Sequence, residues 1–319
     1  MRAGKIPIRS KSRRSTLTRC IVAVTVAASS LLAQTGVQRP HLLGIAHTAF
    51  RVSDLGKTGA FYEASLGFAD PISLAEENGQ AAIALVKVND EQYVELLPGD
   101  AQSEGQLDHF ALYTDDLAAM REYLLAQRIP LLRDIHPGRV GNPFLTIRDS
   151  DGHPLEIVEY SPSSLTGQSK GKFMPADRIT NHITHVGIVV RSTGTALKFY
   201  RDLLGFREIS HSTGEGGQPG LIVLQTPNGN DFIELIPFAA VPSANDMKAN
   251  NHFCLATSDL QKAAATLQSR LGSSLKPKIS VQSGGGLPPR LDVFDPDGAR
   301  IEIMEAIPAA IPATVAPRS

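Results

Sequence analysis

The sequence predicts an α+β protein built from four βαβββ units, which form two tandem domains with curled mixed sheets. Three observations support this fold class. The chain has 319 residues, enough for about two domains of ordinary size. A pattern of residues recurs along the chain at a nearly constant offset, and each predicted unit begins with a histidine and ends with a glutamate.

The recurring pattern indicates a tandem duplication. Its first part is a histidine strand, a Phe-Tyr pair and a Leu-Gly-Phe turn, found at His47, Phe61-Tyr62 and Leu66-Gly67-Phe68 and again 138 residues later at His185, Phe199-Tyr200 and Leu204-Gly205-Phe206. Its second part is an Asp-x-Asp-Gly turn, found at Asp149–Gly152 and again 146 residues later at Asp295–Gly298. We therefore expect two domains at residues 41–160 and 178–306, joined by a solvated linker at 161–177 and followed by a disordered tail at 307–319.

Each half divides once more. The strand at His47 alternates apolar and polar residues, a helix is predicted to begin near Asp54, and short strands end around Glu95. The same order follows from His109 to Glu156, where Asp115 or Asp116 caps a helix over residues 117–127, and again from 185 to 234 and from 252 to 302. Apolar residues at helical spacing predict that the helices cover one face of each sheet, so that the other face lines a half-open cup.

The N-terminus has the pattern of an export signal. Residues 1–33 hold seven basic and no acidic side chains and end in the apolar run 20–33, which is shorter than the ~20 residues of a membrane span. We expect cleavage after Ala33, export to the periplasm or medium, and no stable membrane anchor. Ser12–Leu17 resembles a twin-arginine signal, with an ordinary secretory leader as the alternative.

Charge and cysteine content limit the partners. The 286 residues after the leader carry 24 basic and 32 acidic side chains, and this acidic balance disfavours nucleic acid as a partner. Cys20 lies in the leader, so that Cys254 alone remains and no intramolecular disulfide is expected. We expect a monomer or homodimer that binds a small-molecule substrate.

The histidines and glutamates that bound the units form a candidate metal constellation. Each pair is separated by 47 to 50 residues in all four units, and strand alternation turns both side chains away from the apolar face and into the cup. Two imidazoles and two carboxylates at one point suit zinc, nickel, iron or manganese. The predicted ligands are His47, Glu95, His109 and Glu156 in the first domain, and His185, Glu234, His252 and Glu302 in the second. The ordinary alternative is an inherited scaffold that keeps a metal site in only one copy.

Together with Asp54-Leu55, Phe61-Tyr62, Leu66-Gly67-Phe68 and Asp151-Gly152, these residues resemble the glyoxalase/bleomycin-resistance/extradiol-dioxygenase superfamily, also called vicinal oxygen chelate proteins. The resemblance covers both copies and implies two glyoxalase-like domains. Its glyoxalase pattern implies all eight ligands named above, whereas its extradiol pattern implies His185, His252 and Glu302, with the second domain as the active one. Because both domains here keep these residue types, the sequence departs from a single-site arrangement.

The resemblance leaves three functions open. The leading hypothesis is a metal-dependent lyase or isomerase in which Glu156 or Glu302 moves a proton, with Glu95 or Glu234 as the alternative base. The second is a ferrous extradiol dioxygenase, and the third is a small-molecule-sequestering protein. Arg139 and Arg290 are weaker candidates for holding an anionic substrate, since a solvated surface arginine is the commoner role, and Cys254 is a candidate neighbour of His252. The Phe-Tyr pairs are expected in the core.

Overall fold

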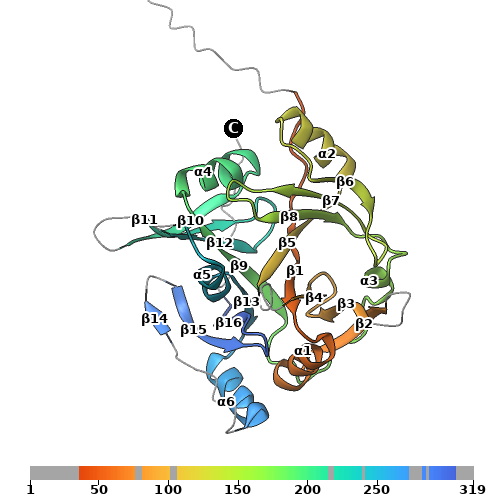
Figure 1. Cartoon of the computed structure of the whole chain (residues 1–319), viewed down its shortest axis with the longest axis vertical. Coiled ribbons are helices and arrows are strands. Elements are labelled where there is room, and N and C mark those ends of the chain that lie inside the picture. Colours follow the sequence, from red (N-terminus) through yellow and green to blue (C-terminus); the bar gives the residue numbers. More distant parts are fainter. Residues whose placement is uncertain are drawn as a thin grey trace, which may run out of the picture. The chain divides into compact units, whose positions relative to one another are not determined.

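The computed structural model describes residues 36–75, 81–100, 106–214, 219–238, 241–272, 282–284 and 287–306. These residues form two eight-stranded sheets with the strand orders β2-β3-β4-β1-β5-β8-β7-β6 and β10-β11-β12-β9-β13-β16-β15-β14 (Figure 1). In each sheet the first strand of one unit lies beside the first strand of the next, as β1 beside β5 and β9 beside β13. The two tandem α+β domains predicted from the sequence are thereby confirmed.

The first sheet and its helices have the following bounds: β1 Gly44–Val52, α1 Leu55–Phe61, the π-turn η1 Tyr62–Leu66, β2 Ala69–Ala75, β3 Ala81–Lys87, β4 Tyr93–Pro98, β5 Leu107–Thr114, α2 Leu117–Ala126, β6 Arg133–Pro137, β7 Pro143–Arg148 and β8 Pro154–Glu159. Helix α3, Leu165–Gln168, lies between the two sheets in the chain. The second sheet and its helices follow: β9 His182–Val190, α4 Thr193–Leu197, η2 Lys198–Leu203, β10 Arg207–Thr213, β11 Pro219–Gln225, β12 Phe232–Pro237, α5 Ala244–Asn250, β13 His252–Thr257, α6 Leu260–Leu271, β14 Gln282–Gly284, β15 Leu287–Phe294 and β16 Arg300–Glu305.

A side-chain cap begins the helix of every unit. Asp54, Asp116, Ser192 and Asp259 each accept a hydrogen bond from the backbone N–H three residues later, which satisfies one of the free donors of the first turn. The predicted helix starts near Asp54 and at 117 are confirmed. After the π-turn η1, Gly67 adopts φ 76°, a backbone conformation that glycine reaches without strain, and the chain turns into β2.

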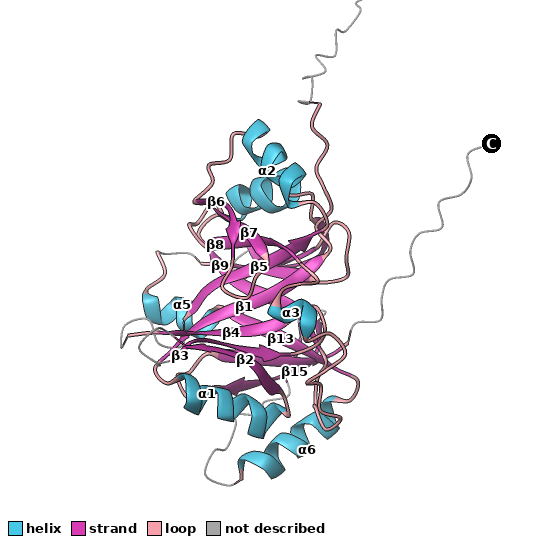
Figure 2. Ribbon diagram, turned by 90° about the vertical axis from the view of Figure 1, so that its right-hand side faces the viewer, coloured by secondary structure: helices cyan, strands magenta, loops and turns pink. Residues whose placement is uncertain are grey.

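The core lies on the face of each sheet opposite the cup. One buried apolar cluster contains Phe50 and Phe110 of the first sheet, Phe253 of the second, and helix residues such as Met120 and Leu124. The rings of Phe50 and Phe253 lie 5.5 Å apart, so that the two sheets pack against each other as well as against their helices. Figure 2 shows α2 on one side of the stacked strands and α1 and α6 on the other. Helices cover this face as predicted, and the second sheet adds to the cover.

The connection between the sheets differs from the sequence prediction. A solvated linker was expected at 161–177, but the side chains of Ser164, Thr166 and Ser169 are buried. Ser169 Oγ lies 2.9 Å from Tyr93 Oη, and the buried Lys87 donates from Nζ to the Ser169 carbonyl at 2.5 Å. Because the hydroxyls find partners within the turn and on the first sheet, these polar residues are buried without losing hydrogen bonds.

The predicted leader at 1–33, with Cys20, and the predicted tail at 307–319 lie outside the described residues. Cys254 is a free, buried thiol. Among the helices of the described part of the chain, none combines the length and apolar character needed to cross a membrane.

Candidate metal centres

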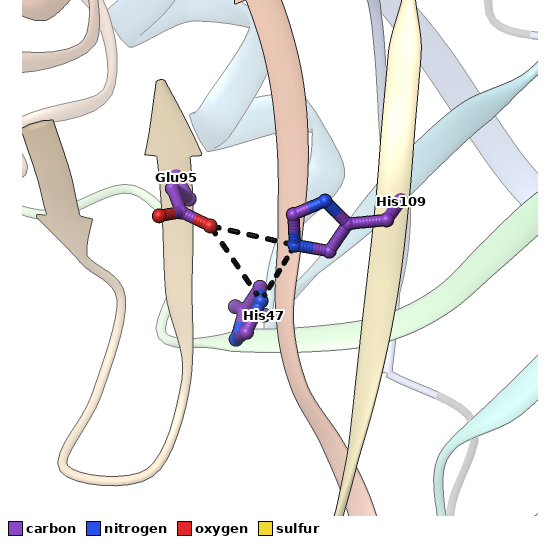
Figure 3. A group of neighbouring side chains, drawn as sticks. All are labelled: His47, Glu95 and His109. Atoms are coloured by element: carbon purple, nitrogen blue, oxygen red, sulfur yellow. Dashed lines mark hydrogen bonds and ion pairs between the residues drawn. The ribbon is translucent and has the colours of Figure 1, made fainter. Parts of the chain in front are cut away.

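The first cluster lies on the four central strands of the first sheet. These strands are neighbours in the order β4-β1-β5-β8, and they carry Glu95, His47, His109 and Glu156 respectively. Residues opposite one another on neighbouring strands lie on the same face of a sheet. The four side chains lie at or near opposite positions of these strands, so they come together on one face. Figure 3 shows His47, Glu95 and His109 pointing toward one another from three different strands.

The donor atoms of this cluster converge. The two histidine Nε2 atoms lie 3.0 Å apart. Glu95 Oε2 is 3.7 Å from His47 Nε2 and 3.4 Å from His109 Nε2. Glu156 Oε2 is 3.6 Å from both. Ligands about 2.1 Å from a common ion lie roughly 3.0–3.5 Å from one another, so the spacing and the donor types fit a divalent transition metal.

Asp108 holds His109 in the orientation that a metal ligand needs. His109 Nδ1 donates to Asp108 Oδ1 at 2.8 Å, which leaves Nε2 facing the cluster. Arg51 Nε in turn donates to Asp108 Oδ2 at 2.8 Å. Burial by itself lowers the pKa of His109, but the hydrogen bonds to Asp108 and Glu95 and the nearby Glu156 carboxylate raise it to about 10. The first cluster is therefore an acidic environment that attracts a cation.

A cavity of about 580 Å³ opens directly over the first cluster. Its floor is formed by the four candidate ligands and its walls by residues of β3, β4, β6, β7, β8 and their loops. The side chains of His47, Glu95 and Glu156 are 17%, 18% and 17% exposed. A small molecule in this cavity can reach the donor atoms.

The second cluster repeats the donor set on β12, β9, β13 and β16. The Nε2 atoms of His185 and His252 lie 3.2 Å apart. Glu234 lies 3.6 Å and 3.7 Å from these two nitrogens, and Glu302 lies 3.6 Å and 3.9 Å from them. The spacing again fits a divalent metal. Here, however, none of the four side chains is more than 3% exposed.

Two arginines distinguish the second cluster from the first. Arg300 donates from Nη2 to Glu302 Oε2 at 2.8 Å, and Arg290 Nε lies 3.3 Å from the same oxygen. Strand register aligns Arg290, opposite Met304, with Phe144 of the first sheet, opposite Val158. The first sheet therefore has an aromatic ring where the second has a guanidinium.

Burial dominates the electrostatics of the second cluster. It lowers the pKa of His252 to about 3, with Arg300 acting in the same direction, whereas the backbone carbonyl of Asn250 opposes the change. Burial and the Glu302 carboxylate raise the pKa of Glu234 to about 8, against the effect of the arginines. Three buried polar atoms, His185 Nδ1, Glu234 Oε1 and Glu302 Oε1, have no hydrogen-bond partner in the described part of the chain. The two glutamate oxygens each lie 3.6 Å from His185 Nε2, so a bound ion or water at that point would satisfy both, whereas His185 Nδ1 lies on the other edge of its ring.

The structure brings all eight predicted ligands into these two clusters. Arg139 lines the cavity over the first cluster, whereas Arg290 lies within β15 against Glu302, so the two arginines are not equivalent. Cys254 lies close enough to His185 and Glu302 to share a metal site with them. Tyr62 and Tyr200 are fully buried in the core, as expected for the Phe-Tyr pairs.

Four contributors were missed from the sequence: Asp108, Arg51, Arg133 and Arg300. Asp108 could have been noticed in the sequence, because it is a carboxylate directly before His109. The equivalent residue before His252 is the uncharged Asn251. None of the three arginines belongs to a motif. The roles of Arg51 and Arg133 depend on strand register, whereas Arg300 lies on the same strand as Glu302, two residues before it and on the same face.

Comparison with known proteins agrees with the architecture. Residues 44–157 and 182–303 both match the Glyoxalase/Bleomycin resistance protein/Dioxygenase superfamily. The chain belongs to this superfamily. It is 34% identical over 90 residues to the uncharacterized protein YwbC of Bacillus subtilis (strain 168), a match that covers 27% of this chain and 70% of YwbC.

Solved structures show the same fold at low identity. The 2,3-dioxygenase LapB of Pseudomonas sp. KL28 aligns with 17% identity and a TM-score of 0.66, over 86% of this chain and 96% of LapB. A variant of homoprotocatechuate 2,3-dioxygenase from Brevibacterium fuscum aligns with 17% identity and a TM-score of 0.64, over 85% of this chain and 73% of that enzyme. At this identity the superfamily fold is shared, and the reaction is a separate question.

Proposed function

We propose that the chain is a metal-dependent enzyme whose active centre is the first cluster, where a small substrate binds through two neighbouring oxygens. The observation that carries this proposal is the convergence of four donor atoms on the floor of a 580 Å³ cavity. The second cluster has the same donors but is closed to solvent.

A divalent ion bound there would polarise a carbonyl or hydroxyl oxygen as a Lewis acid. The residues of the chain would perform the remaining tasks. Asp108 fixes the ring of His109, and the cavity walls orient the substrate. Glu156 lies at the cavity floor and would take up and return a proton, which gives isomerase or lyase chemistry. Glu302 is held by Arg300 and Arg290, so we assign the proton-transfer role to Glu156 rather than Glu302, with Glu95 on the same cavity floor as the alternative base.

We extend the metal assignment to the second cluster, as a closed site. Structural metal sites are closed whereas catalytic sites keep an open position. The unpartnered Glu302 Oε1 faces His185 Nε2 at 3.6 Å, while Oε2 is occupied by the arginines. The proposal thus gives about two ions per chain, one catalytic and one structural, drawn from zinc, nickel, iron and manganese.

The second candidate function is ring-opening extradiol dioxygenation, favoured by the dioxygenases among the proteins of similar fold. In that chemistry two histidines and one carboxylate hold ferrous iron, and Glu95 is dispensable. A protein that only sequesters a small molecule needs no metal in the cavity. Export by a leader at 1–33 is a further proposal, which rests on the sequence.

Metal analysis of the purified chain, combined with metal titration into Glu95→Gln and Glu156→Gln, tests the assignment. Equal and severe losses of affinity at the first site, with zinc, nickel or manganese present, support the four-ligand enzyme. Normal affinity in Glu95→Gln, with iron present and oxygen uptake on catechols, supports the dioxygenase. Glu122→Gln, an exposed carboxylate on α2, is the matched control. A first site that binds no metal contradicts both enzymes.

A further inference from the structure

Two arginines whose side chains have no ion-pair or hydrogen-bond partner among the described residues line the cavity over the first cluster. Arg133 and Arg139 lie on β6 and on the loop that follows it, and both side chains are exposed to the cavity mouth. Neither forms an ion pair within the described residues. The nearby Asp134 is not a partner for them, because Arg121 already holds both of its carboxylate oxygens, at 2.6 and 2.8 Å.

Strand register fixes where Arg133 lies relative to the candidate ligands. Arg133 is opposite Thr146 on β7, and Thr146 is opposite Glu156 on β8. Opposite residues share a face, so Arg133 lies on the cup face two strands from Glu156, about 10 Å between backbones. That separation matches the length of a small organic molecule.

Much of the remaining lining of the cavity is apolar or aromatic, beside the polar Asn142 and Thr166. Ile83, Leu85 and Leu97 contribute aliphatic surface, and Tyr93 and Phe144 contribute rings. His136 packs on Phe144 with ring centroids 4.1 Å apart, which narrows this side of the cavity. The third arginine at the cavity, Arg51, is occupied by Asp108 and by the Pro98 carbonyl.

We propose that the substrate is an amphipathic oxyanion, whose anionic group binds Arg133 and Arg139 while its apolar body lies between them and the metal ligands. The proposal rests on the proposed function in placing the reacting oxygens at the first cluster. Arginine pairs with the planar oxygens of a carboxylate or with a phosphate through two parallel N–H donors, and two unpaired guanidiniums at one mouth suit such a group. Arg133 and Arg139 are binding residues, remote from the reacting atoms.

Calorimetric titration with three probes of one apolar body tests the charge preference without requiring chelation or turnover. The probes are 3-phenylpropanoate, 2-phenylethyl phosphate and the neutral 3-phenylpropan-1-ol. We expect at least one anion to bind about tenfold more tightly than the alcohol, since a charged hydrogen bond contributes that much. Whichever anion binds more tightly identifies the group as carboxylate or phosphate.

Arg133→Gln and Arg139→Gln should each reduce the anion preference several-fold, and the double variant should abolish it while leaving the alcohol unchanged. Arg207→Gln, on β10 of the other sheet, is the matched control and should change nothing. The double variant Glu95→Gln/Glu156→Gln should keep the preference, even if the proposed metal enzyme is wrong. Equal binding of all three probes overturns the inference. An anion preference that survives the loss of both arginines also overturns it. A preference that disappears in the Glu95→Gln/Glu156→Gln variant would overturn it too, because the anion would then bind at the metal.

Discussion

The two clusters of this molecule have the same types of donor residue, but they differ in the residues that contact those donors and in their exposure to solvent. In the first, His109 is held by the Asp108 carboxylate and the donors open into a cavity. In the second, His252 Nδ1 donates to the backbone carbonyl of Asn250 and the carboxylate of Glu302 is held by two arginines. One cluster is acidic and accessible, and the other is closed and contains fixed cations.

This difference shows that one set of candidate metal ligands can occur in two different surroundings. The residues that contact the ligands control the charge, orientation and accessibility of those ligands. The duplication preserved the eight donor residues, while the positions beside them, such as Phe144 opposite Val158 and Arg290 opposite Met304, diverged. Substitutions in and around the two clusters should therefore have different effects.

The largest effect should come from removing a ligand in each cluster. His109→Ala should reduce turnover by more than the roughly 10- to 100-fold expected for a residue beside a ligand, because it removes a proposed ligand of the accessible site. His252→Ala should release one ion per chain and lower the thermal stability, yet preserve measurable turnover. Metal content and activity on the same preparations check this. The reverse pattern would place catalysis in the second cluster.

Arg300→Gln should destabilise the metal-free protein by about 1.5–3 kcal/mol, because the buried Glu302 loses one charged hydrogen bond and keeps only Arg290 as a charged partner. Chemical denaturation after chelator treatment measures this change. Arg121→Gln breaks an ion pair on the exposed surface and should leave the denaturation midpoint nearly unchanged. Similar losses in the two variants would show that the arginine is not needed to hold Glu302.

Asp108→Asn should weaken metal binding at the first cluster by about 10- to 100-fold, since His109 keeps a hydrogen-bond acceptor but loses its charged partner. The second cluster should be unaffected. Competition with a chromophoric chelator resolves the two sites. An unchanged affinity at the first cluster would mean that Asp108 does not support the ligand.

The two histidines should give the metal-free protein opposite pH dependences. The pKa of His252 is about 3 in the folded protein, below its ordinary value of 6.5, so that stability falls as the pH drops from about 6.5 toward 3. The pKa of His109 is raised to about 10, so its contribution is present below pH 6.5 and is lost as the pH rises toward 10.

Denaturation midpoints across pH, in chelator, check this contrast. His252→Gln should flatten the acid side of the profile, and His109→Gln should flatten the alkaline side. An acid-side slope that is unchanged by His252→Gln would show that this histidine does not have a lowered pKa in the folded protein.

The order of the elements and the eight donors were predictable from the sequence, because side-chain alternation along a strand and helix capping are local properties. His47 and Glu95 could be assigned to the cup from their immediate neighbours, and the fourfold spacing of histidine and glutamate selected them from the rest. Asp54 and Asp116 marked helix starts for the same local reason.

Only the tertiary structure decided which cluster is open and what surrounds it. Arg133 reaches the cup through two strand pairings. Strand alternation puts Arg300 on the same face as Glu302, but only the structure shows that both Arg300 and Arg290 contact the Glu302 carboxylate. Ser169, expected in a solvated linker, is buried because Lys87 and Tyr93 provide its partners from far along the chain. Burial and charge at a site depend on segments distant in sequence, which is why local patterns located the candidate ligands and could not predict their environment.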